Sequence, residues 1–221
     1  MLEIIGQSLE DAIKIEGAGA HRIELVSGIS EGGLTPSYAM IEQVIGRVKI
    51  PVNVMVRPHS YSFSYSKADL SVMKEDIKII NSLGANAIVL GCLVNQKVSQ
   101  VSLNALIESV DCQVTFHRAL DESIQLIKDY KDLAHHDKIT QILTSAGLGN
   151  AYDHLHLLDE LYALNPTKLL IGSGVGLNNI AMFYKRYPKA NFHIGSDIRH
   201  HQSFSQSIDE NRLKEILKII S

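Results

Sequence analysis

The stretch CQVTFH, residues 112–117, decides the fold that this sequence predicts. Polar and apolar residues alternate along it from Gln113 to His117, which is the period of a β-strand with one polar and one apolar face. A charged residue, Arg118, follows the stretch, and the chain then has room for one helix before the next apolar run. The stretch therefore predicts a strand with polar residues at its exit, followed by a helix.

Seven more such runs occur along the 221 residues: LEII (2–5), RIELV (22–26), VNVMV (52–56), NAIVLG (86–91), ITQILT (139–144), KLLIG (168–172) and NFHIG (191–195). Helical periodicity fills the segments between them, as at Leu70, Met73, Ile77 and Ile80 in a helix that starts near Lys67. A doubly wound sheet also alternates in this way, but eight full units with a helix after the last strand favour closure. The sequence predicts one α/β domain over residues 1–221, a single (β/α)8 TIM-like barrel.

The polar face of several strands must point into this barrel, because the helices need the apolar face. Barrel interiors are mostly filled with branched aliphatic side chains, so a polar interior requires pairing or a ligand. The residues expected inside are Glu3, Arg22, Glu24, Asn53, Arg57, Gln113, Thr115, His117, Asn191 and His193.

Composition narrows the class of protein. A net charge of −3 argues against a nucleic-acid partner, and no apolar stretch approaches the 20 or so residues of a membrane span. The chain starts on a predicted strand without the features of a signal peptide, and it has two cysteines. We therefore expect a reduced, cytoplasmic protein without a disulfide framework.

Four residues at strand exits are the catalytic candidates, because barrels of this class place their chemistry at the carboxyl ends of the strands. His117 would act as a general acid or base, with Glu24 or His193 assisting. Arg57 suits a carboxylate or phosphate, and an interior ion pair with Glu24 or Glu3 is an equally good interpretation.

The glycine-rich segments GSGVG (172–176) and GSD (195–197) follow the last two strands, where this fold commonly binds phosphate. Tight turns alone would also explain these glycines. The residues expected to hold an anion are Arg57, Arg118, Ser173, Gly174, Gly195 and Ser196.

Three further expectations concern the loops. Asp121 is expected to cap the helix after the fifth strand, and Thr35 to cap the helix that starts at Pro36. Residues 60–66 form either a lid or an ordinary exposed loop. His200 and His201 lie close enough in sequence to join a metal site with His193, although their spacing does not demand one.

Four motifs together resemble the CutC family, which is named for copper homeostasis. They are EGGLTPS (31–37), Arg57-Pro58 followed by Phe63 and Tyr65, VTFHRALD (114–121) and QILTS (141–145). The resemblance runs from the first predicted strand to the eighth and covers roughly the first nine-tenths of the chain. It implies a cytoplasmic TIM-like barrel, often a homodimer, with copper(I) as the candidate ion.

The chain departs from the family's copper-binding members at their cysteines. Ile5, Gly6 and Val26 stand where those members carry cysteines on the first two strands, and Ser64 replaces a further one. Copper(I) prefers thiolate and thioether ligands. Cys92 is the remaining candidate ligand, and a strand of five residues puts Cys112 about 17 Å from it.

Two functions follow as hypotheses. The first is a CutC-like role in copper homeostasis, with direct copper(I) binding as its test. The second is a TIM-barrel enzyme of the isomerase, aldolase or lyase type that acts on a small phosphorylated or carboxylated metabolite. In the second hypothesis Arg57 and the GSGVG backbone hold the anion while His117 moves a proton near a developing oxyanion.

Overall fold

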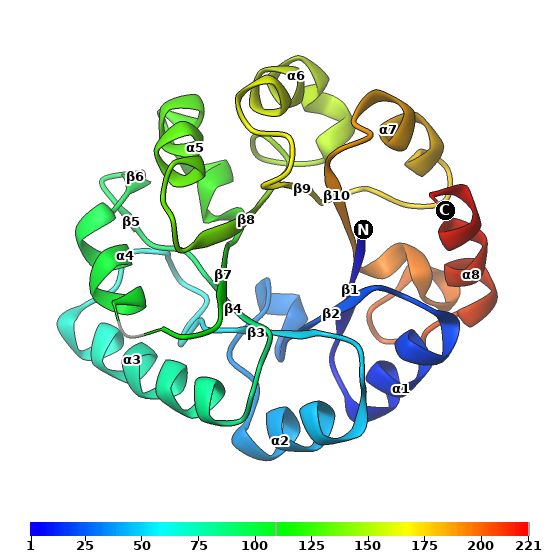
Figure 1. Cartoon of the computed structure of the whole chain (residues 1–221), viewed down its shortest axis with the longest axis horizontal. Coiled ribbons are helices and arrows are strands. Elements are labelled where there is room, and N and C mark those ends of the chain that lie inside the picture. The colour runs from blue at the N-terminus through cyan, green and yellow to red at the C-terminus, as the bar shows by residue number, and fades with distance from the viewer. Residues whose placement is uncertain (109, 221) are drawn as a thin grey trace.

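The computed structural model describes residues 1–108 and 110–220, and it confirms the predicted barrel. Eight parallel strands close into a ring in the order β1-β10-β9-β8-β7-β4-β3-β2 (Figure 1). The barrel strands are β1 (Leu2–Gly6), β2 (Arg22–Leu25), β3 (Val52–Met55), β4 (Ala87–Leu90), β7 (Gln113–Phe116), β8 (Ile139–Thr144), β9 (Leu169–Ile171) and β10 (Asn191–Ile194).

One helix follows each barrel strand, and the helices form the outer ring in Figure 1. They are α1 (Leu9–Ala18), α2 (Tyr38–Arg47), α3 (Lys67–Ser82), α4 (Gln100–Ile107), α5 (Leu126–Ala134), α6 (Leu155–Leu164), α7 (Ile180–Arg186) and α8 (Glu210–Ile219). Their apolar faces pack on the outward residues of the strands, such as Ile4, Ile23 and Val54, in one continuous core. Among the described residues, no helix combines the length and hydropathy that crossing a bilayer requires.

The register of the strands places polar residues side by side inside the ring. Glu3 on β1 pairs with Arg22 on β2 and with His193 on β10, and Glu24 on β2 pairs with Asn53 on β3. These five residues are at most 6% exposed. Most of the polar side chains expected inside the barrel are thus buried there, and hydrogen bonds among them compensate for the loss of water.

Two residues lie elsewhere than the alternation predicted. Gln113, the first residue of β7, is exposed, and Asn191, the first residue of β10, is half-buried. Both lie where their strands enter the barrel, so water reaches that end. Alternation along a strand predicts which face a side chain takes but not how close it lies to the end of the barrel.

Two local features also differ from expectation. Ser37, not Thr35, caps α2, because its side chain accepts a hydrogen bond from the amide of Met40. Thr35 instead accepts a hydrogen bond from the Arg57 amide. A short antiparallel hairpin, β5 (Leu93–Val94) and β6 (Lys97–Val98), stands between β4 and α4, and two-residue strands are too short to show a period in the sequence.

Candidate functional site

A cavity of about 610 Å³ opens at the carboxyl ends of the barrel strands. Its walls come from β1, β2, β3, β8 and β10 and from the loops that follow β2, β3, β7, β8, β9 and β10. A volume of this size suits a small organic ligand. The position agrees with the end of the barrel where the fold carries its chemistry.

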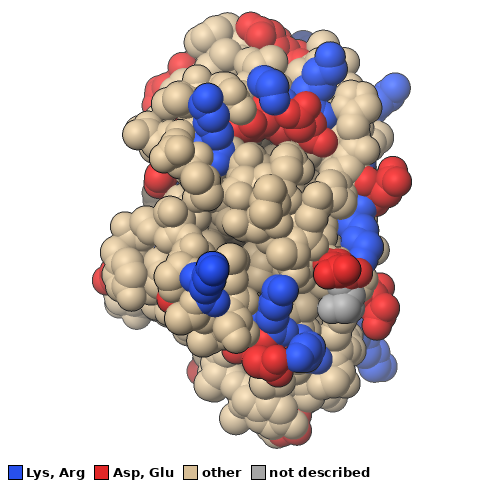
Figure 2. Space-filling model, turned by 90° about the vertical axis from the view of Figure 1, so that its left-hand side faces the viewer, with Lys and Arg blue, Asp and Glu red and all other residues tan. Residues whose placement is uncertain are grey.

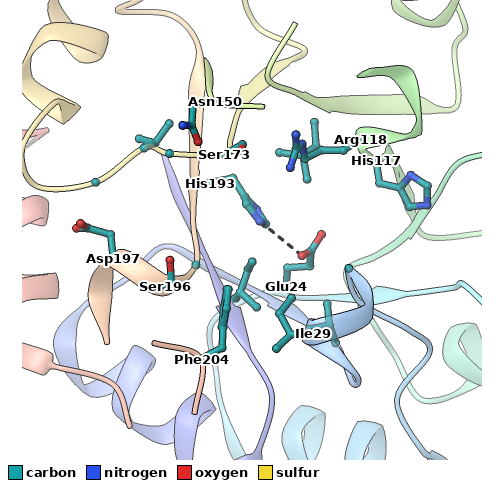
Figure 3. A pocket seen from close by; sticks show the side chains of 18 of the residues that line it. Glu24, Ile29, His117, Arg118, Asn150, Ser173, His193, Ser196, Asp197 and Phe204 are labelled. Carbon is teal, nitrogen blue, oxygen red and sulfur yellow. Dashed lines mark ion pairs between the residues drawn. The ribbon is translucent and has the colours of Figure 1, made fainter. Parts of the chain in front are cut away.

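Glu24 and His193 face each other at the centre of this cavity (Figure 3). The Nε2 of His193 lies 3.6 Å from the Oε2 of Glu24, and both side chains are almost completely buried. Gly172 at the end of β9 leaves room for the imidazole, because a Cβ there would lie 3.3 Å from the His193 side chain. At this distance the two groups form an ion pair when both are charged, without a direct hydrogen bond.

Glu3 orients this pair from below. Its Oε1 lies 2.8 Å from the Nδ1 of His193, while its Oε2 accepts hydrogen bonds from the Nε of Arg22 at 2.5 Å and the Nδ2 of Asn53 at 2.8 Å. Burial opposes the charged carboxylate, but Arg22 and His193 outweigh it and hold the pKa of Glu3 below its ordinary value. An ionised Glu3 fixes the His193 tautomer with Nδ1 protonated and leaves Nε2 toward the cavity.

The second carboxyl of the cluster behaves differently. Burial raises the pKa of Glu24 to about 7, with the Glu3 charge adding to the effect and His193 opposing it. For His193, burial works against the charged form, but the charge of Glu24 and the hydrogen bond to Glu3 raise its pKa above the ordinary value. Protonation of Glu24 and protonation of His193 therefore depend on each other.

Glu24 also has unused bonding capacity. Its Oε1 is buried and has no hydrogen-bond partner among the described residues. Buried polar atoms are nearly always paired, so an unpaired one in a cavity is available to a ligand. A carboxyl with a pKa near neutrality beside an oriented imidazole is suited to moving protons.

The same three side chains are the group in the described chain that offers donor atoms for a metal ion. One donor atom each from Glu3, Glu24 and His193 lies within 4.8 Å of the others. Both oxygens of Glu3, however, are already bonded to Arg22, Asn53 and His193. A cation there would have to break this network, and the Arg22 guanidinium would repel it.

His117 lies at the rim of the cavity, and Figure 3 shows its ring turned away from the Glu24–His193 pair. Its Nδ1 accepts a hydrogen bond from the amide of Ala119, and its Nε2 is buried without a partner in the described chain. Burial, helped by the Arg57 charge, lowers the pKa of His117 to about 3. The imidazole is therefore neutral, and this setting favours a hydrogen-bond donor at Nε2 over a proton acceptor.

Arg57 is engaged with backbone oxygens and does not form the ion pair with Glu24 or Glu3 that was one interpretation of it. Its Nη1 donates to the carbonyls of Glu31 and Gly33, at 2.9 and 3.2 Å, and its Nη2 donates to Ser60 at 3.1 Å. The guanidinium also lies over the Phe63 ring, 4.6 Å from its centre. Arg57 thus ties together the loops after β2 and β3 at the edge of the cavity.

Arg118 and Asp121 form a second polar group beyond β7. Arg118 donates from Nε to Asp121 at 2.8 Å and from Nη2 to the Ser145 hydroxyl at 2.9 Å. Asp121 does not cap a helix as expected; it accepts hydrogen bonds from Thr144 and from the amide and hydroxyl of Ser145. His117 takes the capping position of the 3-10 turn over residues 118–122. Asp121 therefore joins the ends of β7 and β8.

The glycine-rich loops line the cavity, but part of their backbone is occupied. Ser173, Gly174, Gly195 and Ser196 all contribute to the wall. The amide of Leu177, just after GSGVG, donates to the Asp197 carboxylate at 2.8 Å. A carboxylate of the protein thus occupies one amide of the loop where an external anion was expected, and it is itself paired with Arg212 at 2.7 Å.

The candidate copper ligand lies away from this cavity. Cys92 follows β4, is 1% exposed, and donates from its thiol to the carbonyl of Ser99 at 3.6 Å. Burial raises the pKa of this thiol to about 12. Neither Cys92 nor Cys112 belongs to a group of three metal-donating side chains in the described chain, and neither do His200 and His201.

The sequence did not predict several features of the site. Glu3 was expected inside the barrel, but its hydrogen bond to His193 was not, because this bond depends on the closure of β1 against β10, which no local pattern reveals. Asn150, Ile29 and Phe204 line the cavity from loops whose composition is ordinary. These three reach the site through the folding of the loops, and the sequence carries no signal for that.

Comparison with known proteins gives the family. The model of the CutC family matches residues 1–198. The CutC family protein of Erwinia tasmaniensis is 34% identical over 97% of this chain and 88% of its own length, and that of Proteus mirabilis is 37% identical over 82% and 74%. A crystal structure assigned to a copper homeostasis protein CutC from Streptococcus agalactiae superimposes with a TM-score of 0.81 at 25% identity, covering 88% of this chain and 97% of that one.

More distant structures share the fold alone. The phosphoribosylanthranilate isomerase of Thermotoga maritima has a TM-score of 0.68 at 15% identity, over 99% of this chain and 97% of that one. The sequence match over 198 residues and the barrel architecture agree with each other. The chain belongs to the CutC family.

Proposed function

We propose that this protein is a TIM-barrel enzyme that moves a proton on a small anionic metabolite, in a reaction of the isomerase, aldolase or lyase type. The observation that carries the proposal is the buried pair of Glu24 and His193, 3.6 Å apart in a cavity of about 610 Å³. Structural filler in this position of the fold is aliphatic. A titratable pair with perturbed pKa values in a cavity is typical of catalytic sites.

In the proposed reaction the two groups move two different protons: Glu24 takes and returns the proton on carbon, and His193 acts on the oxygen. Because burial raises the pKa of Glu24 to about 7, the carboxyl is poised near neutral pH to take a proton from substrate or return it. His193 presents Nε2 to the same space, held by the bond from Nδ1 to Glu3. The imidazole supplies or removes the second proton at the oxygen on which charge develops.

Proton transfer can be tested before the substrate is known. The protein is incubated in D2O with a mixture of phosphorylated sugars and carboxylic acids, and deuterium incorporation is followed by mass spectrometry. We expect at least one compound to exchange a carbon-bound hydrogen with the wild type, and Glu24→Gln to reduce that rate by roughly 10²-fold or more. Glu160→Gln, an exposed carboxylate on α6, is the matched control.

The proposal fails if no compound exchanges faster with the wild type than with Glu24→Gln. A thermal-shift screen of the same compounds gives an independent reading, because a ligand that binds the folded state raises its melting temperature. A ligand that stabilises the wild type but never exchanges deuterium identifies a binding protein and contradicts catalysis.

Copper(I) binding is the second candidate, favoured by the likeness to a copper homeostasis protein of Streptococcus agalactiae. The thiols of this chain do not fit that ion well. Copper(I) binds a thiolate, whereas burial raises the pKa of Cys92 to about 12 and keeps the thiol protonated. Titration of the reduced protein with copper(I) against a competing chelator tests this function. An affinity too weak to compete, or unchanged in Cys92→Ser, removes direct binding through that thiol.

A further inference from the structure

The cavity has two unlike walls on either side of Glu24 and His193. One wall is apolar and is built by Ile5, Val26, Ile29, Met55 and Phe204. These side chains pack in a small cluster of their own, separate from the core between strands and helices. Figure 3 shows Ile29 and Phe204 together on one side of the Glu24–His193 pair.

The opposite wall is polar and carries Arg118, Asn150 and Ser173, which Figure 3 shows on the other side of the pair. The guanidinium of Arg118 is held by Asp121, by the Ser145 hydroxyl and by the carbonyl of Gly149 at 3.2 Å. Its side chain is still 39% exposed, and no described residue accepts a hydrogen bond from its Nη1. A fixed guanidinium with a free edge toward a cavity is suited to an oxyanion.

We propose that the substrate is an amphipathic anion, with a phosphate or carboxylate group at Arg118 and an aromatic or branched apolar group against Phe204 and Ile29. The reacting atom of this substrate would lie over Glu24 and His193, which rests on the proposed function. The binding of its two ends to the two walls does not depend on that function. A purely polar sugar phosphate would leave the apolar wall facing polar groups, which is the unfavourable arrangement. A purely apolar ligand would leave the Arg118 edge without an acceptor.

Arg118 is better placed than Arg57 to bind the anionic group of the substrate. Arg57 is 6% exposed, and its Nη1 and Nη2 already donate to the carbonyls of Glu31, Gly33 and Ser60. Its remaining donor, Nε, has no partner among the described residues but is fully buried. The Asp197 carboxylate, also in the wall, is neutralised by its pairing with Arg212. The cationic edge open to the cavity is therefore that of Arg118.

Three probe compounds separate the two ends of the ligand. Phenylphosphonate carries both groups, methylphosphonate lacks the ring, and benzyl alcohol lacks the charge. By isothermal titration calorimetry with the full chain, we expect phenylphosphonate to bind roughly tenfold or more tightly than methylphosphonate, because burial of the ring adds apolar contact. We expect benzyl alcohol to bind more weakly than phenylphosphonate by a similar factor.

Variants assign the two ends to the two walls. Arg118→Gln should weaken both phosphonates roughly tenfold, while Phe204→Ala should weaken phenylphosphonate and leave methylphosphonate unchanged. Ile29→Ser is the second variant of the apolar wall, for use if circular dichroism shows that Phe204→Ala does not fold. Arg47→Gln on α2 and Tyr61→Ala, whose side chain is 84% exposed, are the matched controls.

Several results would overturn the proposal. These are equal affinity for the two phosphonates, benzyl alcohol binding as tightly as phenylphosphonate, or no binding of any probe. If the probes bind as expected but no deuterium exchange is found, two-ended binding stands and catalysis falls. If exchange on a metabolite is found while no probe binds, catalysis stands and the amphipathic ligand falls.

Discussion

At the scale of single residues, Glu24 is protonated differently in the folded and the unfolded chain. Burial raises its pKa from 4.5 to about 7. Between these two values the folded protein binds more protons at Glu24 than the unfolded chain does. The contribution of Glu24 to the free energy of unfolding therefore falls as the pH rises through this window, whereas His117, whose pKa is lowered to about 3, contributes in the opposite direction up to its ordinary pKa. His193, whose pKa is also raised, contributes in the same direction as Glu24, since its stabilisation is lost as the pH rises through its folded pKa.

We expect Glu24→Gln to flatten this dependence. Glutamine does not titrate, and without the Glu24 charge the pKa of His193 should fall toward its ordinary value. The wild type should lose roughly 1 to 3 kcal/mol more than the variant between pH 5 and pH 8, at about 1.4 kcal/mol per pKa unit. Urea unfolding at the two pH values measures the difference, with Glu160→Gln as control. Parallel curves for wild type and Glu24→Gln would show that Glu24 does not titrate in this range.

A second prediction concerns the close approach of Gly91 to His117. A Cβ at Gly91 would lie 2.5 Å from the Nδ1 of His117 and 3.0 Å from the Cβ of Ala119. Because the His117 ring is fixed by its bond to the Ala119 amide, it cannot move away cheaply. We expect Gly91→Ala to destabilise the protein by about 1 to 3 kcal/mol.

The control for Gly91→Ala lies in a helix. Gly46, within α2, has nothing within 4 Å of an added Cβ. Gly46→Ala should therefore stabilise the protein by roughly 0.5 to 1 kcal/mol through helix propensity. Chemical denaturation of both variants measures the two changes, and equal effects at the two positions would contradict the steric explanation.

At the scale of elements, the strands and helices were predictable and the loops were not. The stretch CQVTFH became β7 with two residues trimmed, and the helix expected near Lys67 begins at Lys67. Periodicity reports which face of an element is buried, and eight such elements leave few ways to bury all the faces. The same patterns placed Glu24 and His193 in the barrel, because strand parity fixes the inward side chains.

The parts that could not be predicted depend on contacts between loops. Thr35 was expected to cap α2, but it accepts from the Arg57 amide while Ser37 makes the cap. Asp121 was expected to cap the helix after the fifth strand, but it accepts a hydrogen bond from Ser145, which follows β8. For both residues a local helix cap was one possible role and a hydrogen bond to a distant loop was another. The sequence indicates only the local role.

Arg57 gives a prediction at this scale, because it fastens the loop of residues 28–34 to the loop after β3. Lysine keeps the charge but cannot donate to the carbonyls of Glu31, Gly33 and Ser60 at once. We expect Arg57→Lys to increase amide hydrogen exchange at Glu31 and Gly33 by roughly tenfold, corresponding to about 1.4 kcal/mol of local opening. Arg47→Lys is the control. Unchanged exchange in Arg57→Lys would show that the loop holds its shape without the guanidinium.

At the scale of the whole molecule, one side of the barrel is short of charge. Figure 2 faces the side that carries α3, α4 and the β5–β6 hairpin, and its centre is largely free of Lys, Arg, Asp and Glu. Val94, Val101 and Ile124, on the hairpin, on α4 and before α5, are 48%, 82% and 67% exposed. The amide of Ile124 bonds to the carbonyl of Gln96, so the loop and the hairpin adjoin.

We expect this face to join two copies of the chain, as the sequence resemblance implied. Exposed apolar side chains gathered on one face of a protein mark an interaction site. Analytical ultracentrifugation should give a dimer for the wild type and a monomer for Val101→Asp. Ile13→Asp, at an exposed isoleucine on α1 away from this face, distinguishes the patch from a general effect of charge. A monomeric wild type, or a dimer unaffected by Val101→Asp, would contradict this interface.

The hydrogen-bonded chain from Asn86 through Asn53 and Glu3 to His193 has a consequence for engineering. It spans four strands, and exchanging buried ionic groups of this kind for packed aliphatic residues often strengthens a protein. A campaign that selects this barrel for heat resistance alone should therefore drift toward leucine and valine at these positions. The selected variants would be more stable, but the barrel interior would lack the titratable side chains needed for the proposed proton transfer.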